Sequence, residues 1–74
     1  MAHLTPLPAR RVVRALEKLG FQYQRQRGSH ASYAHPDGRV VTVPIHPARD
    51  VARGTLREII RVTGLTVDEF MDLA

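Results

Sequence analysis

Residues 28–45 read GSHASYAHPDGRVVTVPI, and this stretch decides the fold. Two extended runs, 29–35 and 39–45, flank the sequence Pro36-Asp37-Gly38, which is typical of a tight turn. The second run is rich in valine, which favours strands, and it ends in prolines, which cannot donate a ladder hydrogen bond. The stretch therefore predicts a β-hairpin.

Alternation along the hairpin predicts which side chains face the core. Ala31 and Tyr33 should share one face with the valines of the neighbouring strand, and His30 and Ser32 should share the opposite face. A bulge near Gly28 would invert this assignment, and both alternatives remain open.

The segment before the hairpin predicts a helix and a third strand. Apolar residues recur at helical spacing from Pro8 to Leu19, with Pro8 suited to the first helical position and Gly20 to a left-handed stop. Residues 21–27 alternate glutamine with aromatic and basic residues, a period of two that predicts a strand.

Two helices are predicted after the hairpin. Residues 46–54 read as a loop, and Thr55 with Glu58 has the spacing of a capping box that opens a helix ending at Gly64. Thr66 with Glu69 repeats this spacing and predicts a short final helix. The order predicts an α+β sandwich of two layers, a helical layer over three antiparallel strands, as one domain over residues 1–74.

Composition limits the classes of protein to consider. The 74 residues contain no cysteine, which excludes a disulfide framework and a thiolate metal site and fits a reducing compartment. The first eight residues lack the continuous apolar stretch of a signal peptide or membrane span. We therefore expect a soluble, cytoplasmic protein.

Positive charge is concentrated in the first part of the chain. Residues 1–57 hold ten basic side chains and three acidic ones, and ten of the eleven cations in the chain are arginine. Arginine pairs bidentately with phosphate, so this excess favours a polyanionic partner such as RNA. A basic surface that only keeps the protein soluble is the alternative.

His30 is the candidate catalytic residue, because a glycine and two hydroxyls surround it at the start of a predicted strand. In RNA cleavage the 2′-hydroxyl loses a proton and the 5′-oxygen gains one, and a positioned imidazole can serve either step. The alternative is an ordinary surface or hydrogen-bonded histidine. The remaining histidines lack the spacing and the acidic neighbours of a metal site, so we expect no metal.

Residues of the hairpin and the second helix are the candidate RNA contacts. Arginines near the hairpin and on one face of the second helix have the charge and the donor geometry to hold phosphates, although a solvent-facing surface explains them equally well. The candidates are Arg25, Arg27, Ser29, Arg39, Arg53 and Arg57.

Several short motifs follow one another along the chain: VRALEKLGF at 13–21, RGSH at 27–30, HPDGR at 35–39, VTVP at 41–44, GTLR at 54–57 and GLT at 64–66. In this order they resemble the HicA family of messenger-RNA interferases, which are toxins of bacterial type II toxin–antitoxin systems. The resemblance implies a fold like that of double-stranded-RNA-binding domains and a catalytic role for His30. It also implies a HicB-type antitoxin as partner.

From the resemblance and the residues together we expect a metal-independent endoribonuclease without a cofactor, whose partners are messenger RNA and the antitoxin. Two other functions remain open. One is a noncatalytic RNA-binding module, and the other is a protein-interaction module that uses the acidic final helix with Asp68, Glu69 and Asp72.

Overall fold

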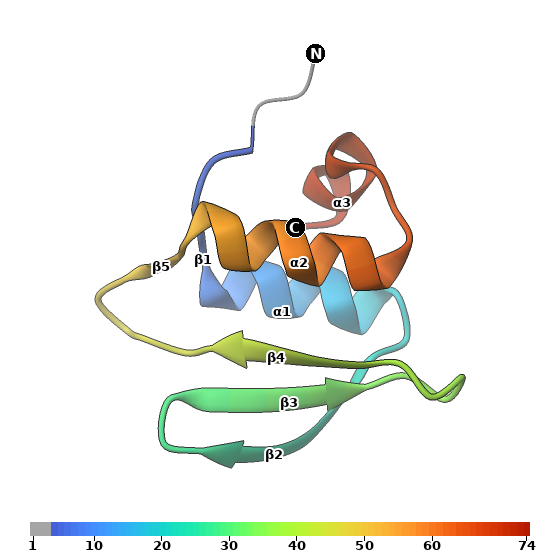
Figure 1. Cartoon of the computed structure of the whole chain (residues 1–74), viewed down its shortest axis with the longest axis horizontal. Coiled ribbons are helices and arrows are strands. Elements are labelled where there is room, and N and C mark those ends of the chain that lie inside the picture. The colour runs from blue at the N-terminus through green and yellow to red at the C-terminus, as the bar shows by residue number, and fades with distance from the viewer. Residues whose placement is uncertain (1–3) are drawn as a thin grey trace.

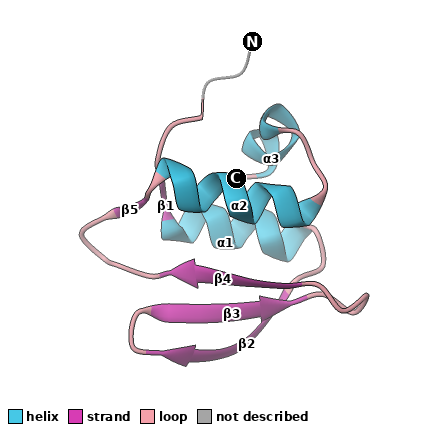
Figure 2. Ribbon diagram, in the orientation of Figure 1, coloured by secondary structure: helices cyan, strands magenta, loops and turns pink. Residues whose placement is uncertain are grey.

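The computed structural model describes residues 4–74, and its architecture is α+β (Figures 1 and 2). The elements in chain order are β1 (Leu7–Pro8), α1 (Ala9–Lys18), β2 (Gln22–Arg27), β3 (His30–Ala34), β4 (Val40–Pro44), β5 (Asp50–Val51), α2 (Arg53–Thr63) and α3 (Val67–Leu73). The predicted fold class and the order of the main elements are confirmed.

The main sheet is antiparallel with the strand order β2-β3-β4. Ala31 is the register partner of Val43 and Tyr33 that of Val41, and all four residues are buried. His30 is exposed on the other face, so the predicted alternation of β3 is confirmed.

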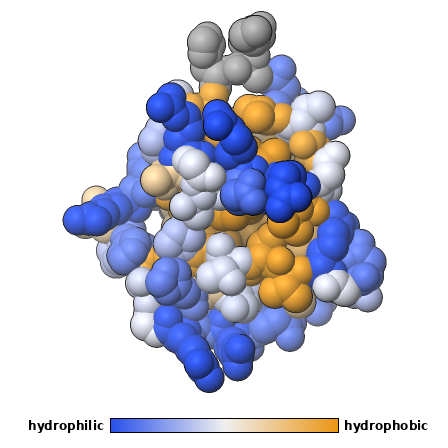
Figure 3. Space-filling view, in the orientation of Figure 1, coloured by the Kyte–Doolittle hydropathy of each residue, from blue (hydrophilic) through white to orange (hydrophobic). Residues whose placement is uncertain are grey.

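Helices α1 and α2 lie on one side of this sheet (Figure 1) and enclose the core with it. Phe21, Phe70, Leu16 and Leu56 are its largest fully buried side chains. On the face shown in Figure 3, hydrophobic side chains also remain visible between α2 and the sheet, where a shallow pocket of about 130 Å³ touches Val41 and Ile59. Strand β2 lies farthest from the helices, and all six of its residues are exposed.

The end of α1 forms as its sequence predicts. Gly20 has φ 98°. The N–H of Gly20 donates to the carbonyl of Glu17, and the N–H of Phe21 donates to the carbonyl of Leu16. This left-handed turn returns the chain toward the core and buries Phe21. The start differs by one residue, because Pro8 precedes the helix with φ −57° and ψ 141° instead of opening its first turn.

The first predicted capping box is wrong and the second is confirmed. Helix α2 begins at Arg53 after an extended Ala52, so Thr55 lies inside the first turn and caps nothing; the N–H of Leu56 donates to the Ala52 carbonyl. In α3, the Thr66 hydroxyl accepts from the N–H of Glu69, and the Glu69 carboxylate accepts from the N–H of Thr66.

The segment 46–54, predicted as a loop, contains the short strand β5. Strand β5 pairs antiparallel with β1, with Leu7 opposite Val51 and Pro8 opposite Asp50. Leu7 and Val51 are buried, so this pair ties the start of α1 to the segment that enters α2. None of the helices in residues 4–74 has the length and apolar character of a membrane span. The expected absence of a signal peptide concerns residues 1–8, of which residues 1–3 lie outside the described part.

Candidate functional site

The site is built on the sheet face that points away from the helices, which we call the outer face. His30 lies between its register partners Arg27 in β2 and Pro44 in β4. Two residues further along β3, Ser32 lies between Arg25 and Thr42. Side chains of directly paired residues project from the same face, with Cβ atoms about 4.5–5.5 Å apart. The outer face therefore presents an imidazole beside two guanidinium groups.

A bulge in β2 brings both arginines to this face. The register shifts between Tyr23 and Arg25, so that Tyr23 is paired with the inward-facing Tyr33, with ring centroids 5.8 Å apart, while Arg25 is paired with Ser32. A regular strand would place Tyr23 and Arg25 on the same face. Since this bulge is not near Gly28, it leaves the face of His30 as predicted.

The turn between β2 and β3 fixes the backbone at His30. Gly28 takes φ 56°, a conformation that suits glycine at the first position of a two-residue hairpin turn. The carbonyl of the half-buried Ser29 accepts a hydrogen bond from the N–H of Ile45 at the end of β4. The backbone just before His30 is thereby held, while its imidazole has no hydrogen-bond partner among the described residues.

The electrostatic environment of the outer face is positive. Strands β2, β3 and β4 contain no aspartate or glutamate. Arg25 and Arg27 are exposed and form no ion pair within residues 4–74. An anion placed against His30 would therefore meet cationic neighbours and no nearby acid of the sheet, which suits a phosphodiester.

The arginines of α2 lie apart from the outer face. Arg53 and Arg57 are exposed on α2, in the helical layer. Figure 1 shows that the start of α2 and the turn between β2 and β3 lie toward the same end of the molecule. The structure thus brings Arg53 and Arg57 to the His30 end without placing them beside the imidazole.

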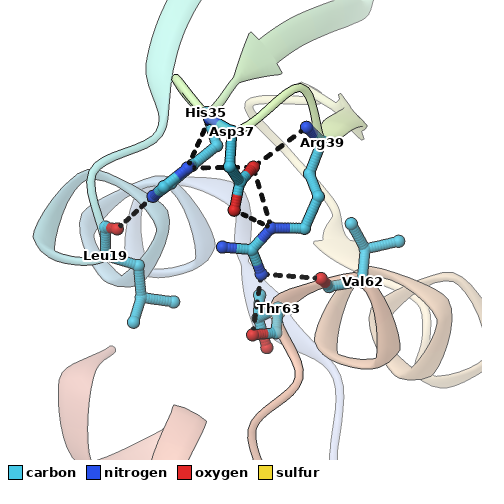
Figure 4. Close-up of polar contacts among 6 residues, drawn as sticks. All are labelled: Leu19, His35, Asp37, Arg39, Val62 and Thr63. Carbon is cyan, nitrogen blue, oxygen red and sulfur yellow. Dashed lines mark hydrogen bonds and ion pairs between the residues drawn. The ribbon is translucent and has the colours of Figure 1, made fainter.

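Arg39 lies at the other end of the hairpin, where it links the turn between β3 and β4 to the end of α2, a connection that we call the clamp (Figure 4). Its Nε donates to both carboxylate oxygens of Asp37, at 3.1 and 2.9 Å, and its Nη1 donates to the carbonyls of Val62 and Thr63, each at 3.0 Å. The guanidinium also lies 5.2 Å from the centroid of the Phe21 ring. Since Arg39 already donates to the carbonyls at the end of α2, we assign it a structural role and leave it out of the RNA-binding residues that we propose.

His35 completes this clamp. Its Nδ1 accepts from the N–H of Asp37 at 3.1 Å, and its Nε2 lies 3.1 Å from the carbonyl oxygen of Leu19 at the end of α1. Its ring meets that of Phe21 edge to face, with centroids 5.1 Å apart. The contacts of His35 are therefore structural, since they hold the turn against the end of α1.

The clamp predicts a dependence of stability on acid pH. The hydrogen bond from Arg39 holds the pKa of Asp37 down at about 2. A carboxyl whose pKa falls on folding stabilises the folded state above its unfolded pKa, near 4, and loses that contribution as the pH falls toward 2. We expect the difference in melting temperature between the parent protein and Asp37→Asn to shrink between pH 4 and pH 2. A constant difference over this range would contradict the assignment.

A second feature at the His30 end is a pocket of about 360 Å³ between the start of α1 and residues 45–50. Arg10, His46 and Arg49 line it. His46 and Arg49 both lie in the segment 46–54, which the sequence predicts only as a loop. No spacing rule connects a helix start with a loop 35 residues further on, so the sequence carried no signal for this convergence.

The described residues contain no group of three histidine or acidic side chains that could hold a metal ion. On the outer face, the ionisable side chains beside the imidazole of His30 are the guanidinium groups of Arg27 and Arg25.

A family model described as the HicA toxin of bacterial toxin–antitoxin systems matches residues 9–65, from the first residue of α1 to just beyond α2. None of the curated proteins compared with the chain matches it. The matched region contains the whole main sheet and therefore every residue of the outer face.

Proposed function

The chain belongs to the HicA toxin family of bacterial toxin–antitoxin systems, and we propose that it exerts its toxicity as a cytoplasmic endoribonuclease that cleaves messenger RNA at the outer face. Membership of the family implies an antitoxin partner. We propose that this partner is of the HicB type and that it blocks access of RNA to His30.

The environment of His30 carries the proposal. A general acid or base must reach the proton it transfers, and the exposed His30 ring has no hydrogen-bond partner within residues 4–74 that would compete for it. In the proposed reaction, His30 accepts the proton of the 2′-hydroxyl or delivers a proton to the 5′-oxygen that leaves. Cleavage then needs no metal ion.

Arg25 and Arg27 hold the phosphates in this proposal. A guanidinium beside the reacting phosphate both positions it and stabilises the negative charge that develops during the reaction. Ser29 contributes its hydroxyl from the turn next to His30. Arg53 and Arg57, which lie on the helical layer, contact the RNA further from the cleavage point.

Incubation of the purified protein with RNA in the presence of a chelator tests the proposal. A metal-independent nuclease cleaves the RNA under these conditions. A noncatalytic RNA-binding module would bind the RNA and leave it intact, and a protein-interaction module would not bind it.

The role of Arg27 predicts a change in salt dependence. When a basic side chain releases counterions from single-stranded RNA, it contributes about 0.7 to the slope of log affinity against log salt concentration. We expect Arg27→Gln in a His30→Ala background to flatten this slope by about 0.7. The equivalent change at Arg14, which is exposed on α1 and away from the sheet, should leave the slope unchanged. Equal slopes for Arg27→Gln and the parent would remove Arg27 from the site.

A further inference from the structure

The pocket of about 360 Å³ at the start of α1 is not used by the proposed reaction. Its walls are residues 8–10, which lead into α1, and residues 45–50, which connect β4 with β5. Two walls from distant parts of the chain converge here because β1 and β5 are paired, with Pro8 opposite Asp50.

The pocket adjoins the outer face through the backbone. Pro44 is the register partner of His30, and the next residue, Ile45, already lines the pocket. The N–H of Ile45 is hydrogen-bonded to the carbonyl of Ser29, the residue before His30. Anything bound in the pocket therefore lies at the same end of the sheet as the imidazole.

The lining of the pocket has the chemistry of an anion site. Arg10 and Arg49 bring two guanidinium groups, and neither forms an ion pair within the part of the chain that is described. His46 adds an imidazole that can donate a hydrogen bond. Guanidinium groups match the oxygens of phosphate in charge and geometry, and the volume falls within the range of small-ligand sites, about 300–1,000 Å³.

Asp50 is the one acidic residue of the lining, and its carboxylate would repel a bound anion. Two guanidinium groups against one carboxylate leave the pocket with a net positive charge even when His46 is neutral. The sign of the effect of Asp50 provides a test: if the pocket binds an anion, removal of this carboxylate must strengthen binding.

We propose that this pocket is a phosphate-binding site. The assignment of the bound phosphate to RNA rests on the proposed function. Arg10 and Arg49 hold the phosphate oxygens. In the RNA complex the occupant is a backbone phosphate next to the nucleotide at His30, and a free phosphate ion presents the same chemistry.

Titration of the full-length, isotopically labelled His30→Ala protein with inorganic phosphate tests the pocket without RNA. We expect saturable NMR shifts confined to amides that line the pocket, such as those of Arg10 and Arg49. The shifts should be lost in the Arg10→Gln, Arg49→Gln double variant and kept in Arg14→Gln, which removes an arginine from the same helix one turn away. Absence of localised shifts would overturn the proposal.

Binding of a labelled single-stranded RNA to the same variants identifies the source of the phosphate. We expect Arg10→Gln and Arg49→Gln each to weaken binding by about 3- to 10-fold at low salt, as the loss of one typical hydrogen bond does. Asp50→Asn should tighten it, and Arg14→Gln should leave it unchanged.

The outcomes separate this proposal from the proposed function. Localised phosphate shifts with unchanged RNA affinity would support a site for free phosphate and overturn the RNA occupant. If the parent protein bound no RNA, the proposed function would fail, and the phosphate titration would still decide the pocket.

Discussion

Replacement of His30 by alanine should abolish growth inhibition and slow RNA cleavage by about 10²- to 10⁴-fold, the contribution typical of a general acid or base. The loss should arise from chemistry, because the exposed ring contributes little to folding. Surface substitutions of this kind usually change the free energy of unfolding by less than about 0.5 kcal/mol.

The measurement compares cleavage by purified parent and His30→Ala proteins in chelator, together with RNA affinity and the melting temperature. Ser32→Ala is the matched control, because Ser32 follows His30 on the same face of β3. The control should retain most of the activity, since a serine hydroxyl does not titrate near neutral pH. A folded His30→Ala protein that cleaves RNA at the parent rate would refute the catalytic assignment.

Replacement of Arg39 by methionine should destabilise the fold by ~2 kcal/mol through the loss of charge-assisted hydrogen bonds and of the contact with the Phe21 ring. For a domain of this size the melting temperature should fall by about 8–16 °C. Methionine keeps much of the aliphatic packing of the side chain, so the loss reports chiefly on the guanidinium. The last carbonyls of α2, on Val62 and Thr63, then lose their donor.

Arg61→Met is the control for this prediction. Arg61 forms an exposed ion pair with Glu58 at 3.2 Å, and such exposed pairs contribute little to stability. Thermal unfolding of the two variants should therefore separate them clearly, while RNA affinity of Arg39→Met below its melting temperature should match that of the parent. A melting temperature unchanged by Arg39→Met would contradict the clamp.

The sequence predicts those parts of the fold that depend on local interactions. The turn at Pro36–Gly38, the left-handed stop at Gly20 and the capping box at Thr66 each involve residues within a few positions of one another. The start of α2 was missed because its boundary is set by β5, whose two residues pair with β1 more than 40 positions earlier. A two-residue strand has no periodicity to detect.

The same distinction applies to the candidate site. Alternation alone places His30 on the face opposite Tyr33, and neighbouring positions in β2 suggest Arg25 and Arg27. The partners of Arg39 are 23 and 24 residues away in α2, so the spacing of residues in the sequence does not predict its structural role. The pocket at Arg10 and Arg49 depends on tertiary convergence in the same way.

The exposure of β2 has a consequence for experiments that remove its arginines. As the outermost strand it presents unpaired backbone N–H and carbonyl groups, to which a strand of another molecule can add. Positive charges at 25 and 27 repel an identical strand, whereas glutamine at both positions would leave the uncharged segment QYQQQQ, which favours self-association. Lysine substitutions keep the repulsion and remove only the planar guanidinium, so they separate loss of RNA contact from edge-to-edge aggregation.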